Sequence, residues 1–343
     1  MLERNRQWLL KSRPSGTLGL EHFEYREQRF TPPHLEAGQV LVRNLVLSCA
    51  PTIRNWMNEA QRSYRAPIAL GAPIVGPACA QVVSSRHRRF LPGALLIGVS
   101  RWEDYSVIQP DAAFAPVLEV PAGVAPVDAL GIYGLNSLTA YFGLLEVGRA
   151  TAGETVVVSG AAGAVGSIAV QLAKIKGCRV IGIAGGRDKC QWLLEACGAD
   201  GAIDYKSADI AAALAELAPK GVDVFFDNVG GEILQTLVDH MAVHGRIVVC
   251  GQVSAYDSAT TAPGPRDMMR VVYRRLTIRG FVLGDFIAQA AASRAELIRW
   301  VEERKIRRHE DVRSGFAVLP AAFLELFSGR NRGGLLVEIA RPY

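Results

Sequence analysis

From residue 126 to about residue 304, short apolar runs alternate with stretches in which apolar residues recur every three or four positions. The spacing of Val165, Ile168, Leu172 and Ile175, for example, places them on one face of a helix. The apolar runs are ETVVVSG, CRVIGIA, GAIDY, VDVFFDNVGG, RIVVCG and LTIRGFVL. Six buried strands separated by helices are typical of a parallel sheet, so this pattern predicts an α/β fold with a doubly wound, nucleotide-binding sheet.

The first 125 residues follow a different pattern, in which short β-like runs stand close together among Pro and Gly residues. These runs are QVLVRNLVLSC, PACAQVVSS, ALLIGVS and DYSVIQ, and they predict a compact, barrel-like β-domain. The tail FAVLPAAFLELFSGRNRGGLLVEIA contains a further helix and strand but is too short to fold alone. We therefore expect residues 305–343 to complete the domain formed by residues 1–125, with residues 126–304 as the second domain.

Composition and charge narrow the class of protein. Half of the 343 residues are hydrophobic, which is enough for two packed cores. The net charge of +5 is compatible with one phosphorylated cofactor, and we expect no nucleic-acid partner. No run approaches the ~20 apolar residues of a membrane span, and no signal-peptide pattern opens the chain. The six cysteines include no C-x-x-C pair, so we expect no structural zinc, no disulfides and a cytoplasmic setting.

The segment SGAAGAVGS follows the first strand of the predicted sheet and precedes its first helix. Gly160, Gly163 and Gly166 are spaced three apart in it, a variant of the G-x-G-x-x-G pattern. Glycine lets backbone N–H groups approach a pyrophosphate, and the helix that follows offers its positive N-terminal end. The alternative is that the three glycines serve only tight packing, but the strand–loop–helix context favours a dinucleotide site.

In NAD-binding sheets an acidic residue usually closes the second strand and binds the ribose 2′-hydroxyl. Here that strand closes on two glycines, and Gly186 is followed by the cations Arg187 and Lys189. The glycines leave room for a 2′-phosphate, the cations attract it, and Tyr205 at the end of the third strand can add a hydroxyl donor. The pattern therefore favours NADPH. Alternatively, Arg187 and Lys189 are solvated residues of a helix for which Asp188 is the N-cap, or Asp188 is a displaced ribose acid.

Several long stretches resemble one known family: NRQWLL, GLNSLTAYFGLLEVG, GETVVVSGAAGAVGSIAVQLAKIKGCRVIGIAGG, DVFFDNVGGEIL, GRIVVCGQVSAY and NRGGLLVEI. The chain resembles the zinc-free branch of the medium-chain dehydrogenase/reductase superfamily, and within it the prostaglandin reductases, plant alkenal double-bond reductases and bacterial curcumin-reductase-like enzymes. The resemblance implies a GroES-like β-barrel beside the six-stranded Rossmann sheet. It further implies NADPH-dependent reduction of the C=C bond of a small enal or enone without metal, and a homodimer that pairs through LTIRGFVL.

The resemblance also implies which residues contact the cofactor. They are Ala162, Gly163, Ala164 and Val165 at the pyrophosphate, Lys189 and Tyr205 at the 2′-phosphate, and Asn228, Cys250, Gly251, Val253, Tyr256, Phe281, Val282, Leu283 and Asn331 elsewhere. Tyr256 matches the tyrosine that the family places beside the substrate, where its phenol can bind the carbonyl oxygen as negative charge develops. The alternative for Tyr256 is a packing role on the cofactor side.

The residues of the predicted site that would contact the substrate differ from the family pattern. Family members carry Asp-Pro-Tyr-Met-Arg-Gly where this chain has APTIRN, so Ala50 replaces the Asp and Thr52 replaces the Tyr. Asn136 stands in a segment that is usually more apolar. We expect Thr52, Trp56 and Asn136 to shape a partly polar substrate pocket. The Pro- and Gly-broken segment SATTAPGPRDMMR, residues 258–270, is predicted to form a loop over that pocket.

Two other functions and a metal site are alternatives to this interpretation. Cys49 lies near the position of the first ligand in zinc alcohol dehydrogenases, but no His follows it in APTIRNWMNE, so we expect no metal. A related zinc-free branch reduces quinones with a similar glycine loop. A non-catalytic, NADPH-binding sensor is the third possibility, and the altered segment around Thr52 is its best support.

Overall fold

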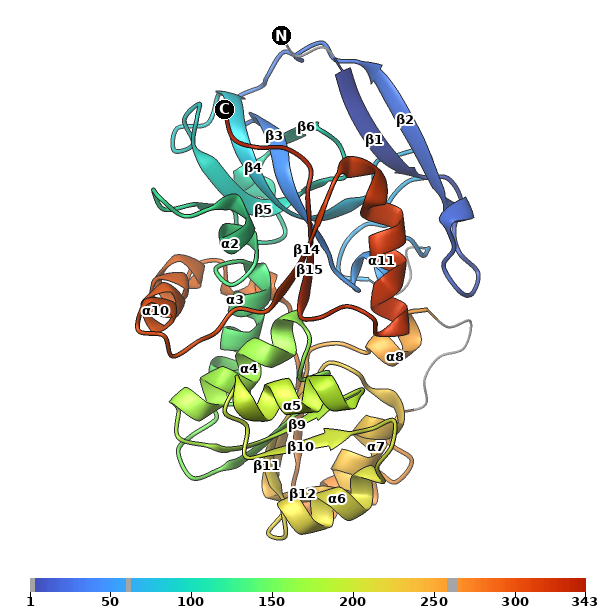
Figure 1. Cartoon of the computed structure of the whole chain (residues 1–343), viewed down its shortest axis with the longest axis vertical. Helices are drawn as coiled ribbons and strands as arrows, with labels where there is room; N and C mark the ends of the chain where they lie inside the picture. Colours follow the sequence, from blue (N-terminus) through green and yellow to red (C-terminus); the bar gives the residue numbers. More distant parts are fainter. Residues whose placement is uncertain (1–3, 60–62, 258–263) are drawn as a thin grey trace. The chain divides into compact units, whose positions relative to one another are not determined.

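The structure, a computed structural model of the chain, describes residues 4–59, 63–257 and 264–343. The chain forms two compact units (Figure 1). Unit 1 consists of Met1–Leu135 together with Glu310–Tyr343, and unit 2 consists of Asn136–His309. The expected boundaries, after residues 125 and 304, differ from these by ten and five residues. The first differs because helix α2 (Pro126–Leu130) packs on the sheet of unit 1.

Unit 2 is built on a six-stranded sheet in which every neighbouring pair is parallel, in the order β10-β9-β8-β11-β12-β13. This is the doubly wound order, and it confirms the predicted fold class. The strands are β8 (Thr155–Ser159), β9 (Arg179–Ala184), β10 (Gly201–Asp204), β11 (Val222–Asp227), β12 (Met241–Val249) and β13 (Thr277–Gly280). Chain order reverses between β8 and β11, the point at which such sheets bind ligands.

The helices of unit 2 include those expected between the strands and short additions around them. They are α3 (Leu135–Tyr141, whose first residue belongs to unit 1), the π-helix η4 (Phe142–Val147), α4 (Ala164–Ile175), α5 (Arg187–Glu195), α6 (Ile210–Leu217), α7 (Gly231–His240), α8 (Val253–Tyr256), α9 (Met269–Arg274), the 3-10 helix η5 (Leu283–Phe286) and α10 (Ala290–Glu302). The strand residues Val157, Ile181 and Phe225 are fully buried. This explains why the strands have near-continuous apolar runs: helices cover both faces of a parallel sheet.

Unit 1 contains a seven-stranded sheet in the order β14-β15-β3-β4-β5-β7, with β6 pairing β3, and a separate antiparallel hairpin of β1 and β2. Its elements are β1 (Arg4–Leu10), β2 (Phe23–Arg29), β3 (Val40–Cys49), α1 (Ile53–Trp56), β4 (Val75–Ser85), β5 (Leu95–Arg101), β6 (Tyr105–Ile108), β7 (Leu118–Glu119), β14 (Glu310–Ser314), α11 (Leu319–Ser328) and β15 (Gly334–Glu338), with 3-10 turns at Leu20–His22, Pro110–Ala112 and Phe316–Val318. All four strands predicted in this region are present.

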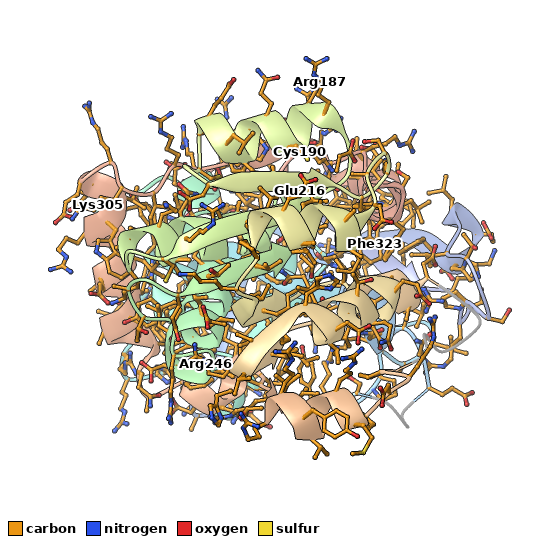
Figure 2. All side chains as sticks on the ribbon, turned by 90° about the horizontal axis from the view of Figure 1, so that it is seen from below. Arg187, Cys190, Glu216, Arg246, Lys305 and Phe323 are labelled. Carbon is orange, nitrogen blue, oxygen red and sulfur yellow. The ribbon has the colours of Figure 1, made fainter. Side chains whose placement is uncertain are left out.

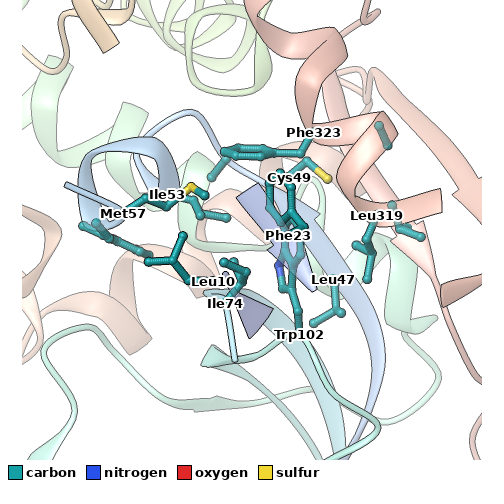
Figure 3. Packing of buried hydrophobic residues seen from close by; sticks show 14 of the residues in the cluster. Leu10, Phe23, Leu47, Cys49, Ile53, Met57, Ile74, Trp102, Leu319 and Phe323 are labelled. Atoms are coloured by element: carbon teal, nitrogen blue, oxygen red, sulfur yellow. The ribbon is translucent and has the colours of Figure 1, made fainter. Parts of the chain in front are cut away.

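The C-terminal tail joins unit 1 as expected. Strand β15 pairs antiparallel with β3, so that Leu335 lies opposite Cys49. Helix α11 contributes Phe323 to the core, where its ring makes an edge contact with Trp102 at 5.6 Å between ring centroids. The ring of Phe23, from the hairpin, stacks on Trp102 at 6.2 Å (Figure 3). One hydrophobic core therefore contains side chains from the hairpin, the sheet and the tail.

Three further structural findings bear on the class of protein. All six cysteines are free thiols. Among the described residues, no group of three or more His, Cys, Asp or Glu side chains is arranged to hold a metal ion. In the same part of the chain, no helix has both the length and the apolar character needed to cross a membrane.

Candidate functional site

The glycine segment forms the turn between β8 and α4. Gly160 has a φ of +58°, in the left-handed region that favours glycine. The N–H of Gly163 donates to the carbonyl of Gly160 at 3.0 Å and closes the turn. A Cβ atom on Gly166 would lie 2.3 Å from that same carbonyl oxygen. The absence of a side chain at Gly166 thus lets α4 approach the turn closely.

The first turn of α4 presents backbone donors at the end of the sheet. The N–H groups of Ala164, Val165 and Gly166 have no preceding helical turn to bind. Gly163 is the N-cap and has no side chain that could accept their hydrogen bonds. A helix of 12 residues also concentrates positive potential at this end. Together the amides and the helix end are suited to a pyrophosphate.

Asp227 closes β11 and is fully buried. Its carboxylate accepts hydrogen bonds from the Ser159 hydroxyl at 2.7 Å and from the backbone N–H groups of Val229 and Gly230 at 2.9 and 3.0 Å. Burial raises the pKa of Asp227, and these hydrogen bonds oppose that shift. Asn228 follows, and its side-chain amide donates to the carbonyl of Ser159 at 2.7 Å. These bonds fix the ends of β8 and β11 to each other.

The chain that follows β12 is hydrogen-bonded to the same two residues, Asp227 and Asn228. The backbone carbonyl of Asp227 accepts the N–H groups of Cys250 at 2.9 Å and Gly251 at 3.1 Å. Val253, the first residue of α8, donates its N–H to the carbonyl of Asn228 at 3.2 Å. Burial raises the pKa of the Cys250 thiol to about 12, so this cysteine is protonated at neutral pH. The expected cofactor contacts Asn228, Cys250, Gly251 and Val253 therefore lie together.

Tyr256 ends α8 and is half-buried. Its hydroxyl accepts the backbone N–H of Gln252 at 3.1 Å, and the side chain covers Gly251, on which a Cβ would lie 3.0 Å from the hydroxyl oxygen. A phenol that accepts one hydrogen bond can still donate its own proton. Tyr256 can therefore serve as a donor to a carbonyl oxygen. Of the predicted pocket loop, residues 258–263 lie outside the described residues.

The turn between β9 and α5 is where an acid would bind the ribose of NAD. Gly186 is the N-cap of α5 and has a φ of +102°. Asp188 is the second residue of the helix, so its interpretation as the N-cap is wrong. Arg187 is exposed and points away from the sheet in Figure 2, whereas Lys189 is half-buried. Two cations thus follow the glycine turn.

Tyr205 and Asp204, at the end of β10, shape the same turn. The Tyr205 ring lies against Gly185, on which a Cβ would be 2.8 Å from the ring. The Asp204 carboxylate accepts the N–H groups of Gly186 at 2.8 Å and Lys206 at 3.1 Å. These hydrogen bonds, with that from Gly186 the largest cause, lower the pKa of Asp204. The acid on the neighbouring strand therefore holds the turn in shape.

The segment after β13 differs from the expected strand Phe281–Leu283, because the strand ends at Gly280. The Phe281 ring packs on Gly143 of the π-helix, where a Cβ would lie 2.6 Å from the ring. Val282 donates its N–H to the Asp285 carboxylate at 3.3 Å, and Leu283 begins the 3-10 helix η5. The backbone turns here because local hydrogen bonds replace pairing with β12.

The remaining expected site residues are mostly in unit 1. Thr52 precedes α1 and is half-buried, whereas Trp56 is buried and makes an edge contact with Phe114 at 5.7 Å. Asn331 lies in the turn before β15, where its side chain donates to the backbone carbonyl two residues on. Asn136 is half-buried in α3 and is the first residue of unit 2.

Comparisons with known proteins identify the family. A family model described as zinc-binding dehydrogenase matches residues 164–303, and one described as the N-terminal domain of oxidoreductase matches residues 6–116. The NADPH-dependent curcumin reductase of Escherichia coli K12 is 36% identical over 98% of both chains. Prostaglandin reductase 1 of Bos taurus is 36% identical over 97% of this chain and 98% of its own. The chain belongs to the medium-chain dehydrogenase/reductase family.

The fold agrees with this assignment along its whole length. The crystal structure of CurA from Vibrio vulnificus in complex with NADPH matches with a TM-score of 0.87 and 34% identity, over 98% of this chain and all of that one. Within the medium-chain dehydrogenase/reductase family, the chain falls in the zinc-free branch that includes these reductases. The resemblance of the quoted sequence stretches is thus confirmed.

Sequence reasoning missed three residues of this medium-chain reductase site: Ser159, Asp204 and Asp227. Each is the last residue of its strand, and each uses side-chain oxygens to hold a neighbouring turn. A small polar or acidic residue that closes an otherwise apolar strand was the available signal. Its meaning depends on which strands lie side by side, which the pattern alone does not state.

We expect Gly166→Ala to weaken NADPH binding at least about tenfold, because its Cβ would force α4 away from the Gly160 carbonyl. Gly163→Ala is the matched variant in the same turn: its Cβ would lie 3.2 Å from the same oxygen and needs only a small shift. Titration of both variants by fluorescence, at fixed salt and with thermal unfolding as a folding check, measures the difference. Wild-type affinity in Gly166→Ala would contradict the close approach of helix and turn.

Proposed function

We propose that this protein reduces the C=C bond of α,β-unsaturated aldehydes and ketones, using NADPH and direct hydride transfer without a metal. The observation that carries this proposal is the near-full-length similarity to reductases named for NADPH-dependent curcumin reduction and for prostaglandin reduction. The CurA structure, which contains NADPH, supports the choice of cofactor. The glycine turn and the cations after β9 in this chain support it independently.

We assign the cofactor contacts by the same reasoning. The amides at the start of α4 bind the pyrophosphate, and the turn after β9 takes the 2′-phosphate between Lys189, Arg187 and the hydroxyl of Tyr205. The other proposed contacts are Gly160, Ala162, Gly163, Gly186, Asn228, Cys250, Gly251, Val253, Tyr256, Phe281, Val282, Leu283 and Asn331. Thr52, Trp56, Asn136 and Tyr256 line the substrate side in this proposal.

The proposed chemistry uses Tyr256 as an electrostatic catalyst. When bound, NADPH supplies the hydride that the β-carbon of the enone accepts. Negative charge then develops on the carbonyl oxygen, and the Tyr256 hydroxyl donates a hydrogen bond to that oxygen. The N–H of Gln252, 3.1 Å from the phenol oxygen, holds the hydroxyl in place and polarises it. Addition of a proton at the α-carbon completes the saturated product.

The direct test of the proposed function is NADPH oxidation against a panel of enals, enones and quinones. Wild type is expected to turn over enals and enones, and Tyr256→Phe to lower kcat by about ten- to a hundredfold, a larger effect than its weakening of NADPH binding. Tyr25→Phe, at an exposed tyrosine of β2, is the matched control. Turnover of quinones alone would assign the protein to quinone reduction, and tight NADPH binding without any turnover would favour the sensor.

The cofactor preference is tested separately. Replacement of both Arg187 and Lys189 by Gln is expected to raise the KM for NADPH at least about tenfold and to leave the KM for NADH unchanged, because only NADPH carries the 2′-phosphate. Lys220→Gln, at an exposed turn before β11, controls for the loss of surface charge. Equal use of the two cofactors by wild type would refute the proposed role of these cations.

We further propose a homodimer formed through β13. This strand is at the edge of its sheet, its residues are exposed, and α9, which precedes it in the chain, has no buried residue. The exposed apolar side chains there are Met268, Met269, Val272, Tyr273 and Ile278. An open strand edge favours pairing with another strand, and a twofold axis would supply the same strand of a second copy.

Light scattering is expected to give twice the chain mass of 37.0 kDa for wild type, and a single-chain mass for Ile278→Lys. The introduced charge would have to be buried against its own copy across the twofold axis. Circular dichroism checks that the variant keeps its fold. A single-chain mass for wild type at micromolar concentration would rule out the dimer.

A further inference from the structure

A cavity in unit 1 is lined by residues of both the β1–β2 hairpin and the sheet. Its volume is about 280 Å³. The lining residues are Arg4, Arg6 and Glu27 of the hairpin, Arg43 of β3, Asp104, and Tyr105 at the start of β6. All of them lie in unit 1, and none is among the residues assigned above to the cofactor or the enone. We call this space the hairpin cavity.

Two of the three arginines in the hairpin cavity are paired with carboxylates. Arg6 donates to Asp104 through Nε at 3.0 Å and through Nη2 at 2.8 Å, and its backbone N–H donates to the same carboxylate at 2.8 Å. The side-chain hydrogen bond with Asp104 is the largest cause that raises the pKa of Arg6. Arg4 lies 2.6 Å from Glu27. Each carboxylate on the cavity wall therefore already has a guanidinium partner.

Arg43 is the third arginine, and its contacts are all with neutral groups. In the part of the chain that the structure describes, its Nη1 donates to the backbone carbonyl of Arg341 at 3.1 Å. Its guanidinium carbon lies 4.4 Å from the ring centroid of Tyr343. A guanidinium has five N–H donors, so most of those on Arg43 are left for solvent or a ligand. The unbalanced positive charge of the cavity wall is thus that of Arg43.

A pair of tyrosines supplies a neutral donor beside this cation. Tyr105 lies opposite Arg43 in the antiparallel pairing of β6 with β3, so the two side chains share one face of the sheet. The hydroxyl oxygens of Tyr105 and Tyr343 are 3.1 Å apart. Whichever hydroxyl accepts that hydrogen bond keeps its own proton to donate elsewhere. Burial is the largest cause that raises the pKa of Tyr105, which is therefore neutral at physiological pH.

We propose that the hairpin cavity binds a small organic acid with one carboxylate. The carboxylate pairs with the planar fork of Arg43 and accepts the remaining hydroxyl proton of the tyrosine pair. A second negative charge is disfavoured, because the other two guanidiniums have partners and the two carboxylates of the wall repel it. The cavity has room for about nine water molecules at ~30 Å³ each. A ligand of that size carries an organic part no larger than about one six-membered ring.

Binding in the hairpin cavity would connect two parts of unit 1. The ligand would touch the hairpin and the sheet at once, and the unfolded chain offers no such cavity. A ligand that binds only the folded protein raises its stability by mass action. The proposal uses no NADPH and no hydride transfer, so it stands or falls independently of the proposed reduction.

Calorimetric titration of the full chain with benzoate tests the site, because benzoate carries one carboxylate on one ring. Wild type is expected to bind it with a Kd in the millimolar range, and to bind the uncharged analogue benzamide at least about tenfold more weakly. Arg43→Gln is expected to weaken benzoate binding about tenfold. Arg43→Lys keeps the charge without the fork, so an intermediate Kd is expected. Arg26→Gln, at a β2 arginine that pairs with Glu24, is the matched control and is expected to keep the wild-type Kd.

Thermal unfolding gives a second readout. Saturating benzoate is expected to raise the Tm of wild type and of Arg26→Gln, and to raise that of Arg43→Gln less at the same concentration. Circular dichroism checks that each variant is folded. Equal benzoate binding by wild type and Arg43→Gln would place the ligand elsewhere and overturn the proposal, as would equal binding of benzamide or no binding of benzoate. Tighter binding of phenyl phosphate than of benzoate would overturn the assignment to a single carboxylate.

Discussion

The nucleotide-binding end of unit 2 depends on one buried carboxylate. Burial of Asp227 is unfavourable unless its oxygens are hydrogen-bonded, and they are bound by the Ser159 hydroxyl and by two backbone amides. Its own carbonyl binds the first residues after β12. Three neighbouring strands thus end at a shared point, where the turns that present backbone donors begin. The proposed catalytic tyrosine lies on the third of these turns, so its position follows from the same bonds.

Hydrogen bonds to an acidic side chain also hold the turn after β9 in shape. The acid that the NAD pattern leads one to expect on that strand is absent, but Asp204 closes the next strand and binds the Gly186 amide. Its oxygens are occupied by backbone donors and by the Ser207 hydroxyl. Acidic residues at both turns therefore support the backbone, while the groups suited to bind phosphate are amides and cations.

The strands of unit 2 could be predicted from sequence because burial on both faces leaves uninterrupted apolar runs. Strands β2 and β14 gave no such signal: β2 buries only Phe23, and β14 buries no residue. The glycine turn could be predicted from its spacing, since its function depends on local backbone geometry. The roles of Asp204 and Asp227 could not, because each depends on neighbours that are adjacent only in the folded chain.

The pairing of β15 with β3 has a consequence for how the protein is made. Unit 2 is one continuous stretch, 136–309, and can fold as soon as it leaves the ribosome. Unit 1 cannot complete its sheet until residues 310–343 have been synthesised, because β15 pairs directly with β3. Throughout synthesis of unit 2, the edge of β3 that β15 will occupy is open to other strands. Synthesis of residues 310–343 therefore ends the period in which this edge of the nascent chain is open to aggregation.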